Sequence, residues 1–462
     1  MKILVINVSL RPQSLLRLFP IGLGYIATAI KNAGFAFDLL DIDIDRPSPS
    51  YIEEFLKNNR YDVICMGCIV TGYKIVKEYS SFIKLAHPQT KIIVGNSVAT
   101  SIPHILLTRT SVDYAVIGEG EQTVVDLLHA IAGKGDVNKV SGVSFLNNGK
   151  VVTTVPRVPI EDISTIPPID FSIFNVEKYI EYSKVYPADP LPIPRDRVRG
   201  LPVNTARGCV ANCGFCYHVF KGVPYRYRSA KSLVAEIRSL IEKYSLNHLF
   251  FLDELTFFSK KHTLELVDRI LDEKIEFYWK GNCRSNLFDR EEDLEIMAKM
   301  KAAGCQSMSY SLESADEGIL RDMNKKVSVA HFSRQTKLFH KAGLPVLTSL
   351  VIGYPQETPE TIKKTFDCCI ENRIYPSAGY LLPQPGSSIY DYARQHGFIK
   401  DEEEYLLLMG DRQDLRLNMT SMSDQQLQDC VLDGLKRCNV ELGMGLVEGS
   451  LIKTQHYRAP KL

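Results

Sequence analysis

Three cysteines lie close together near residue 210, at a spacing that could hold a metal centre. Cys209, Cys213 and Cys216 follow a C-x3-C-x2-C pattern on a loop punctuated by glycines. The first residues of the chain do not resemble a secretion signal, and cysteines clustered in a reducing compartment suit metal binding better than disulfides. Structural zinc sites and electron-transfer clusters are normally closed by four protein ligands. Three cysteines therefore leave one position for a ligand that is not protein.

The pattern C-x3-C-x2-aromatic-C, with Phe215 before the third cysteine, resembles the signature of the radical S-adenosylmethionine (SAM) enzymes. The resemblance implies that Cys209, Cys213 and Cys216 hold a [4Fe-4S] cluster whose open iron binds SAM. It also implies that the reduced cluster cleaves SAM to a 5'-deoxyadenosyl radical, and that Phe215 packs beside adenine. A zinc knuckle or chance clustering of cysteines is the alternative.

Four further segments downstream resemble the SAM-binding motifs of this family. The resemblance implies that Glu254, or its neighbour Asp253, accepts a hydrogen bond from the methionyl ammonium of SAM, and that Arg284 pairs with the SAM carboxylate. Glu313 would accept hydrogen bonds from the ribose hydroxyls, and Val351 would contact adenine. The alternatives are a helix N-cap at Asp253 and a surface salt bridge at Arg284.

These residues need a scaffold that brings them to one edge. Strand-like runs alternate with helical ones after residue 200, which favours an open (β/α)6 barrel. In barrels of parallel strands the chemistry sits on loops at the carboxyl ends of the strands, and the cysteine loop follows the first predicted strand. The predicted strands are 203–206, 248–252, 275–280, 306–312, 346–352 and 378–382.

The first third of the chain has the pattern of a second α/β unit. Apolar runs at 2–8, 62–68, 90–95 and 113–117 are separated by segments of helical period. This alternation predicts a doubly wound, Rossmann-like parallel sheet, which binds ligands beyond the carboxyl ends of its strands. Cys65 and Cys68 spell C-x-x-C at the end of one run, where either redox activity or simple burial could account for them.

Glycine-rich segments follow these runs: Pro20-Ile21-Gly22-Leu23-Gly24-Tyr25, Gly95-Asn96 and Gly118-Glu119-Gly120-Glu121. Their order resembles the cobalamin-binding domain that precedes the radical SAM core in one large subfamily. The resemblance implies that these loops surround the corrin ring and its nucleotide tail. The chain lacks the Asp-x-His-x-x-Gly motif, so cobalamin would bind base-off without a histidine ligand. The candidate cobalamin-binding residues are Gly22, Gly24, Thr71, Tyr73, Gly95, Asn96, Gly118, Glu119, Gly120 and Glu121.

Two features of this candidate site stay open. Asn96 stands where many relatives have a second glycine. Asparagine tolerates left-handed backbone angles and could replace that glycine, or it could mark a domain that has lost its cofactor. Thr71 and Tyr73 could approach cobalt, or they could be helix-cap and packing residues.

The length of 462 residues favours two domains plus a tail. We predict an α/β protein with a doubly wound cobalamin-binding domain at 1–140, a hairpin and proline-rich linker at 141–200, a partial (β/α)6 barrel at 201–397 and a helical C-terminal cap at 398–462. The hairpin turn is expected at Asn147-Asn148-Gly149. A net charge of +1 gives no argument for nucleic acid, and the absence of a long apolar run argues against membrane insertion, so we expect a cytoplasmic protein.

Together the two resemblances imply an enzyme that methylates an unactivated carbon of a small metabolite or natural-product intermediate, with cobalamin as a cofactor beside the cluster and SAM. An electron donor of the flavodoxin or ferredoxin type is implied as a partner. No protein residue is assigned as a general base. The alternatives are a non-methylating radical SAM reaction, such as dehydration, cyclisation or epimerisation, with a structural or degenerate cobalamin domain, and a cofactor-binding sensor.

Overall fold

The computed structural model describes the whole chain except residues 188–189, 411, 448, 450 and 453–462. The chain divides into two compact units. The first contains Met1–Tyr179, Tyr217–Val223 and Ile399–Gly410, and the second contains Ile180–Cys216, Pro224–Phe398 and Asp411–Leu462. The hairpin and most of the proline-rich segment therefore group with the first unit, and the C-terminal region is shared between the two.

The first unit is built on a seven-stranded sheet with the order β2-β1-β3-β4-β5-β6-β7. Its first five strands are parallel, and β6 and β7 form an antiparallel hairpin along one edge. The four predicted apolar runs form β1, β3, β4 and β5, which confirms the doubly wound fold. The strands are β1 (Ile3–Asn7), β2 (Phe37–Asp41), β3 (Val63–Gly67), β4 (Lys91–Gly95), β5 (Tyr114–Val116), β6 (Val143–Asn147) and β7 (Lys150–Thr153).

Strand β2 was not predicted from the sequence. It lies at the edge of the sheet, pairs only with β1 and has two aspartates among its five residues. A strand with one neighbour buries less surface and so does not need a continuous apolar run.

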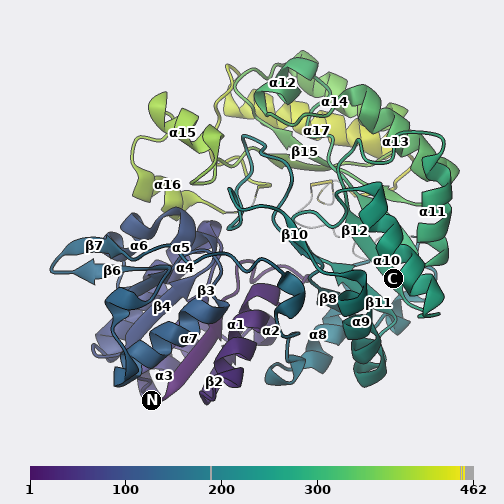
Figure 1. Ribbon diagram of the computed structural model, residues 1–462. Coiled ribbons are helices and arrows are strands. Elements are labelled where there is room, and N and C mark those ends of the chain that lie inside the picture. The colour runs from purple at the N-terminus through teal and green to yellow at the C-terminus, as the bar shows by residue number, and fades with distance from the viewer. Residues whose placement is uncertain (188–189, 411, 448, 450, 453–462) are drawn as a thin grey trace. The chain divides into compact units, whose positions relative to one another are not determined.

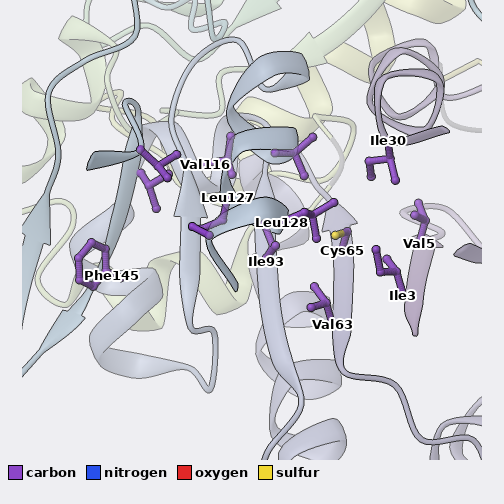
Figure 2. Close-up of a cluster of buried hydrophobic side chains, with 14 residues drawn as sticks. Ile3, Val5, Ile30, Val63, Cys65, Ile93, Val116, Leu127, Leu128 and Phe145 are labelled. Carbon is purple, nitrogen blue, oxygen red and sulfur yellow. The ribbon is translucent and has the colours of Figure 1, made fainter. Parts of the chain in front are cut away.

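Helices cover this sheet and start just after the strand ends (Figure 1). Figure 2 shows how Ile3 and Val5 of β1, Cys65 of β3 and Ile93 of β4 share one apolar cluster with Leu127 of α7. The helices of this unit are α1 (Ile21–Asn32), α2 (Ile42–Asp45), α3 (Pro49–Asn58), α4 (Tyr73–Ala86), α5 (Ser97–Ser101), α6 (Pro103–Arg109), α7 (Glu121–His129) and α16 (Glu402–Leu408), while α8 (Val176–Tyr182) runs from the first unit into the second.

In its described part, the second unit contains seven parallel strands at six barrel positions, because two short consecutive strands share one position. Five strands form a sheet with the order β14-β13-β12-β11-β8, and β15 pairs with β16. Only Thr348 separates β14 from β15, and a bridge between Glu313 and Leu350 continues the pairing, so the arrangement is the predicted partial barrel. The strands are β8 (Gly200–Val203), β11 (His248–Phe251), β12 (Tyr278–Asn282), β13 (Cys305–Ser309), β14 (Val346–Leu347), β15 (Ser349–Ile352) and β16 (Ser377–Tyr380).

The first barrel strand lies at 200–203 and not at the predicted 203–206. Residues after Val203 leave the sheet because Asn204 and Thr205 bond to the carboxylate of Asp253. The chain then forms β9 (Ala206–Arg207), which pairs antiparallel with β10 (Arg226–Tyr227). The third strand differs in the other direction: it lies at 278–282, closer to the C-terminus than the predicted 275–280.

The two faces of the barrel strands differ in polarity. Trp279 and Tyr310 are buried on the face that meets the helices, where Tyr310 contacts Phe332 and Phe339 of α13. The alternate positions form the opposite, inner face. The barrel helices are α9 (Ala230–Tyr244), α10 (Lys260–Asp272), α11 (Asp293–Ala302), α12 (Glu317–Asp322), α13 (Val329–Lys341), α14 (Pro359–Glu371) and α15 (Ser388–Gln395).

The described part of the C-terminal region contains the helices α16 and α17. Its long helix α17 (Asp424–Glu441) lies along α14 (Figure 1). Gly434 of α17 meets the ring of Phe366, and Arg437 pairs with Asp367. Among the described residues, no helix is long and apolar enough to cross a membrane.

Candidate functional site

The cysteine loop is held at both ends by the short β9–β10 pair, in which Arg207 faces Arg226. All eleven cysteines of the chain are free thiols. Two contacts tie the loop to the segment after α12: the backbone N–H of Gly214 donates to the Met323 carbonyl at 2.8 Å, and the Asn324 side chain donates to the Asn212 carbonyl at 2.7 Å. The three thiols therefore share one anchored loop next to the carboxyl end of β8.

The chemistry of this donor set fits an iron–sulfur cluster. Burial raises the pKa of the Cys209 thiol, whereas the positive charges of Arg284 and Lys325 act in the opposite direction and favour the thiolate. In the described part of the chain, no three His, Cys, Asp or Glu side chains converge on a single metal ion. Three thiols on one loop are the donor type that iron–sulfur clusters take.

Glu313 is buried shortly after the fourth barrel strand, and one of its oxygens has no partner in the described structure. Its backbone has a φ of 65°, and its Oε1 pairs with the Lys325 ammonium at 2.8 Å. Its Oε2 is buried without a hydrogen-bond partner among the described residues. A buried carboxylate oxygen left in this way is costly, so the site fits a ligand that donates hydroxyl groups.

Three of the residues predicted to contact SAM, Glu313, Phe215 and Arg284, lie around Lys325. Its ammonium lies 5.8 Å from the centroid of the Phe215 ring, and its carbonyl accepts a hydrogen bond from the Arg284 guanidinium. The Arg284 side chain holds the backbone at Lys325 and Lys326, and it makes no salt bridge with any residue that the structure describes. Sequence reasoning missed the role of Lys325, because its pairing with Glu313 depends on the fold.

Asp253 and Glu254 have different environments. The Asp253 carboxylate accepts hydrogen bonds from Asn204 Nδ2 at 2.7 Å and from Thr205 Oγ1 at 2.6 Å, so it holds the turn between β8 and β9. Burial raises its pKa to about 7 against these bonds. Asp253 is not a helix cap, since Ser259 caps α10. Glu254 is exposed, and its Oε2 accepts from the Gly208 N–H at 3.2 Å, which aims it at the cysteine loop.

Val351 is buried on β15, and its N–H donates to the Glu313 carbonyl at 3.2 Å. Next to it lies Glu357, which sequence reasoning missed. One Glu357 oxygen accepts from the Gly353 N–H, the other has no partner in the described structure, and burial raises the pKa of this carboxyl to about 8. The signal in the sequence was an acid four residues after Gly353, but its burial could not be read from the spacing.

In the first unit the candidate cobalamin residues lie at the carboxyl edge of the sheet. The last residues of β1, β3 and β4 are in register, with Asn7 beside Gly67 and Gly67 beside Gly95. A Cβ atom added at Gly22 or Gly118 would meet nothing within 4 Å. These two glycines therefore leave the edge open.

Gly24 and Gly120 serve packing. A Cβ at Gly24 would fall 2.9 Å from the ring of Phe19, and one at Gly120 would fall 2.9 Å from Ile26 Cδ1. Both glycines are therefore explained by the close approach of neighbouring side chains within this unit.

The loops after β3 and β4 are bonded to each other. The Val70 N–H donates to Ser97 Oγ at 2.8 Å, and the Ser97 N–H donates to Asn96 Oδ1 at 2.6 Å. Thr71 is half-buried in this loop. Tyr73 is fully buried, and its hydroxyl donates to Glu403 Oε1 at 2.9 Å, so its hydroxyl is engaged inside the unit.

The last two candidates lie beyond β5. Glu119 accepts a hydrogen bond from the Ile160 N–H at 2.7 Å, which turns its carboxylate toward the segment after the hairpin. Glu121 is half-buried in the first turn of α7.

Apolar side chains are exposed near this edge. Leu10, Leu15 and Leu18 follow β1 with exposed fractions of 37%, 71% and 38%, and Ile69 follows β3 with 42%. Exposed apolar side chains that gather at a ligand-binding edge fit a large, partly apolar ligand such as a corrin ring. Cys65 and Cys68 are buried, which raises the pKa of each to about 12 and argues against redox activity of the C-x-x-C motif.

Comparison with known families separates the chain into the same two parts. The family model for the radical SAM superfamily matches residues 203–369, and the model for the B12 binding domain matches residues 13–128. The chain is 26% identical to an uncharacterised methyltransferase of Pyrococcus horikoshii over 81% of this chain and 78% of that protein. It is also 26% identical to the anaerobic magnesium-protoporphyrin IX monomethyl ester cyclase of Rubrivivax gelatinosus, over 84% of this chain and 68% of that protein.

Among solved structures, the fold is similar to that of the radical SAM methyltransferase TsrM from Kitasatospora setae with cobalamin and a [4Fe-4S] cluster bound. The TM-score is 0.66 at 18% identity, over 86% of this chain and 75% of that chain. This likeness shows that the two share an overall fold.

Proposed function

We propose that this chain, which belongs to the radical SAM superfamily and carries a B12-binding domain, methylates an unactivated carbon of a small molecule. It is a radical SAM enzyme, and its cofactors are a [4Fe-4S] cluster, SAM and cobalamin. The observation that carries the proposal is the pairing of a three-cysteine loop on a partial barrel with an open, apolar strand edge on a doubly wound sheet. When bound, the cluster and SAM supply a carbon radical for hydrogen abstraction, and cobalamin supplies a transferable methyl group.

The residues of the chain bind and orient these groups. Cys209, Cys213 and Cys216 would hold the cluster and leave one iron for SAM. The free oxygen of Glu313 would accept the ribose hydroxyls, and Glu254, aimed at the cysteine loop, would accept the methionyl ammonium. The side chains thus act by position and charge.

The inner face of the barrel supports a hydrophilic substrate. Lys280, Ser309, Ser311 and Ser349 occupy this face and are partly exposed, while their neighbours Trp279 and Tyr310 are buried. The Lys280 ammonium lies 3.6 Å from the centroid of the Tyr186 ring. We take these hydroxyl and ammonium groups as contacts for polar groups of the substrate.

Two finer features belong to the same proposal. Reductive cleavage of SAM needs one electron from outside, which implies a flavodoxin-type or ferredoxin-type partner. Eleven free thiols fit a reducing compartment and support a cytoplasmic location.

The test uses the full chain, purified without oxygen and reconstituted with iron and sulfide. After hydroxocobalamin is added and the unbound ligand removed, we expect about one cobalt per protein and base-off absorption. With SAM and a chemical reductant we expect 5'-deoxyadenosine. The Cys213→Ala variant should lose SAM cleavage yet keep cobalt. A wild-type protein that cleaves SAM without retaining cobalt would refute the methyltransferase proposal.

The second candidate function is a non-methylating radical reaction. It is favoured by the similarity to the magnesium-protoporphyrin IX monomethyl ester cyclase of Rubrivivax gelatinosus, whose name describes ring formation and not methylation. SAM labelled in its methyl group separates the two in a cell extract that contains the substrate. A methyltransferase moves the label into a product, whereas a cyclase leaves the label in methionine.

A further inference from the structure

A glutamate from the C-terminal part of the chain packs within the first unit, to which residues Ile399–Gly410 belong. Glu403 lies in α16, whose N-cap Asp401 accepts the N–H of Glu404 at 2.9 Å. The Glu403 carboxylate accepts from the Tyr73 hydroxyl at 2.9 Å and pairs with the Lys77 ammonium. Arg109 of α6 lies 3.8 Å from its other oxygen. Glu403 thus joins α16 to α4 through two hydrogen-bond donors and to α6 through a longer ion pair.

Tyr73 connects Glu403 to the carboxyl edge of the sheet, where the candidate cobalamin-binding residues lie. It is the first residue of α4 and directly follows the short helix η1 (Val70–Gly72). Just before it, a Cβ added at Gly72 would fall 2.1 Å from Cys68 Sγ and 2.6 Å from Leu10 Cδ2. The loop is therefore packed tightly at Gly72 and held by a hydrogen bond at Tyr73.

The same loop is bonded to the neighbouring strand end. The Cys68 N–H donates to the Gly95 carbonyl at 3.4 Å, and the Val98 N–H donates to the Cys68 carbonyl at 3.2 Å. A shift of residues 68–73 would consequently displace the Gly95–Asn96 turn as well. The hydrogen bond between Tyr73 and Glu403 therefore affects the positions of two loops at this edge, the one after β3 and the one after β4.

We infer that Glu403 is a positioning residue for cobalamin: by holding Tyr73 it sets the loop at 68–73 in the conformation that accepts the corrin. The inference rests on the proposed cobalamin binding. It assigns to Tyr73 a supporting role behind the site, in place of the contact with cobalt considered from the sequence. Glu403 acts through Tyr73 and Lys77.

The experiment compares Glu403→Ala with the matched control Glu404→Ala on the same helix, whose side chain is exposed. Full-length proteins with reconstituted clusters are titrated with hydroxocobalamin by absorbance. A lost hydrogen bond to a charged group, partly screened by solvent, should raise Kd roughly 3- to 10-fold for Glu403→Ala. Glu404→Ala should match the wild type.

Two readouts separate positioning from general stability. Amide hydrogen exchange of residues 68–73 should be faster in Glu403→Ala than in Glu404→Ala. Tyr73→Phe combined with Glu403→Ala should weaken binding no more than Glu403→Ala does, because both remove the same contact.

The outcomes are distinct. An unchanged Kd in Glu403→Ala, or unchanged exchange at 68–73, overturns the inference and leaves the proposed function standing. A wild-type protein that binds no hydroxocobalamin overturns both. Glu403→Gln, which keeps an acceptor for Tyr73 but loses the charge, should give an intermediate Kd.

Discussion

Asn96 occupies backbone angles that residues with a side chain seldom adopt. Its φ of 69° and ψ of −161° lie in a region that glycine alone enters without strain. Because Oδ1 faces the Ser97 N–H, the side-chain amide directs its N–H groups away from that bond, at an exposed position on the cobalamin edge. Strain retained at such a place is a common feature of ligand-binding sites, so we propose that Asn96 contacts cobalamin.

Asn96→Gly should therefore stabilise the protein and weaken cobalamin binding. Relief of the strained angles should contribute about 1 kcal/mol, and loss of the cap only a few tenths. We expect a higher midpoint of thermal unfolding without cofactor and a higher Kd for hydroxocobalamin. Asn96→Ala keeps the strain and loses the cap, so it should lower both stability and affinity. An Asn96→Gly protein that binds cobalamin as well as the wild type would assign Asn96 to the fold alone.

Glu313 is the residue on which SAM binding should depend most among the buried carboxylates. Glu313→Gln removes the charge that faces Lys325 and places an amide N–H where the free oxygen stands. A hydrogen bond to a charged group contributes about 1.5–3 kcal/mol, so KM for SAM should rise about tenfold or more. The measurement is 5'-deoxyadenosine formation against SAM concentration, with Glu291→Gln, a surface glutamate paired with Lys341, as the control.

At the scale of elements, the contact between α14 and α17 depends on a glycine in mid-helix. A Cβ at Gly434 would lie 2.1 Å from the Phe366 ring, so the two helices approach more closely than any other residue would allow. Helix propensity alone favours alanine over glycine by about 1 kcal/mol. The sign of the change in unfolding free energy in Gly434→Ala therefore shows whether helix propensity or the clash with Phe366 is the larger effect.

We expect Gly434→Ala to destabilise the protein by about 1–3 kcal/mol, because overpacking outweighs propensity. Chemical denaturation followed by circular dichroism measures this change. Asp433→Ala, at an exposed neighbouring position, should be neutral or slightly stabilising. A more stable Gly434→Ala variant would mean that α17 can move away from α14 at little cost.

At the scale of the whole molecule, Glu357 makes stability depend on pH. Its pKa rises from 4.5 in the unfolded chain to about 8 in the folded one, chiefly by burial. Between these values the folded protein binds more protons than the unfolded chain. Stability therefore falls as pH rises through this window, by at most about 1.4 kcal/mol per pH unit.

Glu357→Gln mimics the protonated form and should remove this dependence. The difference in unfolding midpoint between the variant and the wild type should grow in favour of the variant from pH 5 to pH 9. Glu360→Gln serves as the control, since the pKa of Glu360 lies below its ordinary value and this carboxyl does not titrate in that range. Parallel stability curves for wild type and Glu357→Gln would show that Glu357 is ionised in the folded protein at pH 7.

The sequence by itself determined the kind of chemistry and the class of fold. Cys209, Cys213 and Cys216 are within eight residues of one another, so their spacing on a loop is a local property. The apolar runs of β1, β3, β4 and β5 are equally local, because a strand buried on both faces must be continuously apolar. The glycines at 22 and 118 also follow from local turns, although their open surroundings do not.

Only the tertiary structure decided how the candidate residues are buried and which partners they pair with. Asp253 and Glu254 are adjacent in sequence, but Asp253 holds Asn204, 49 residues away, while Glu254 stays exposed. Tyr73 turns its hydroxyl to Glu403, 330 residues along the chain. Hydrogen-bond partners so far apart leave no periodic trace in a sequence. Burial and pairing of a polar side chain depend on what the rest of the chain places beside it, and spacing cannot reveal that.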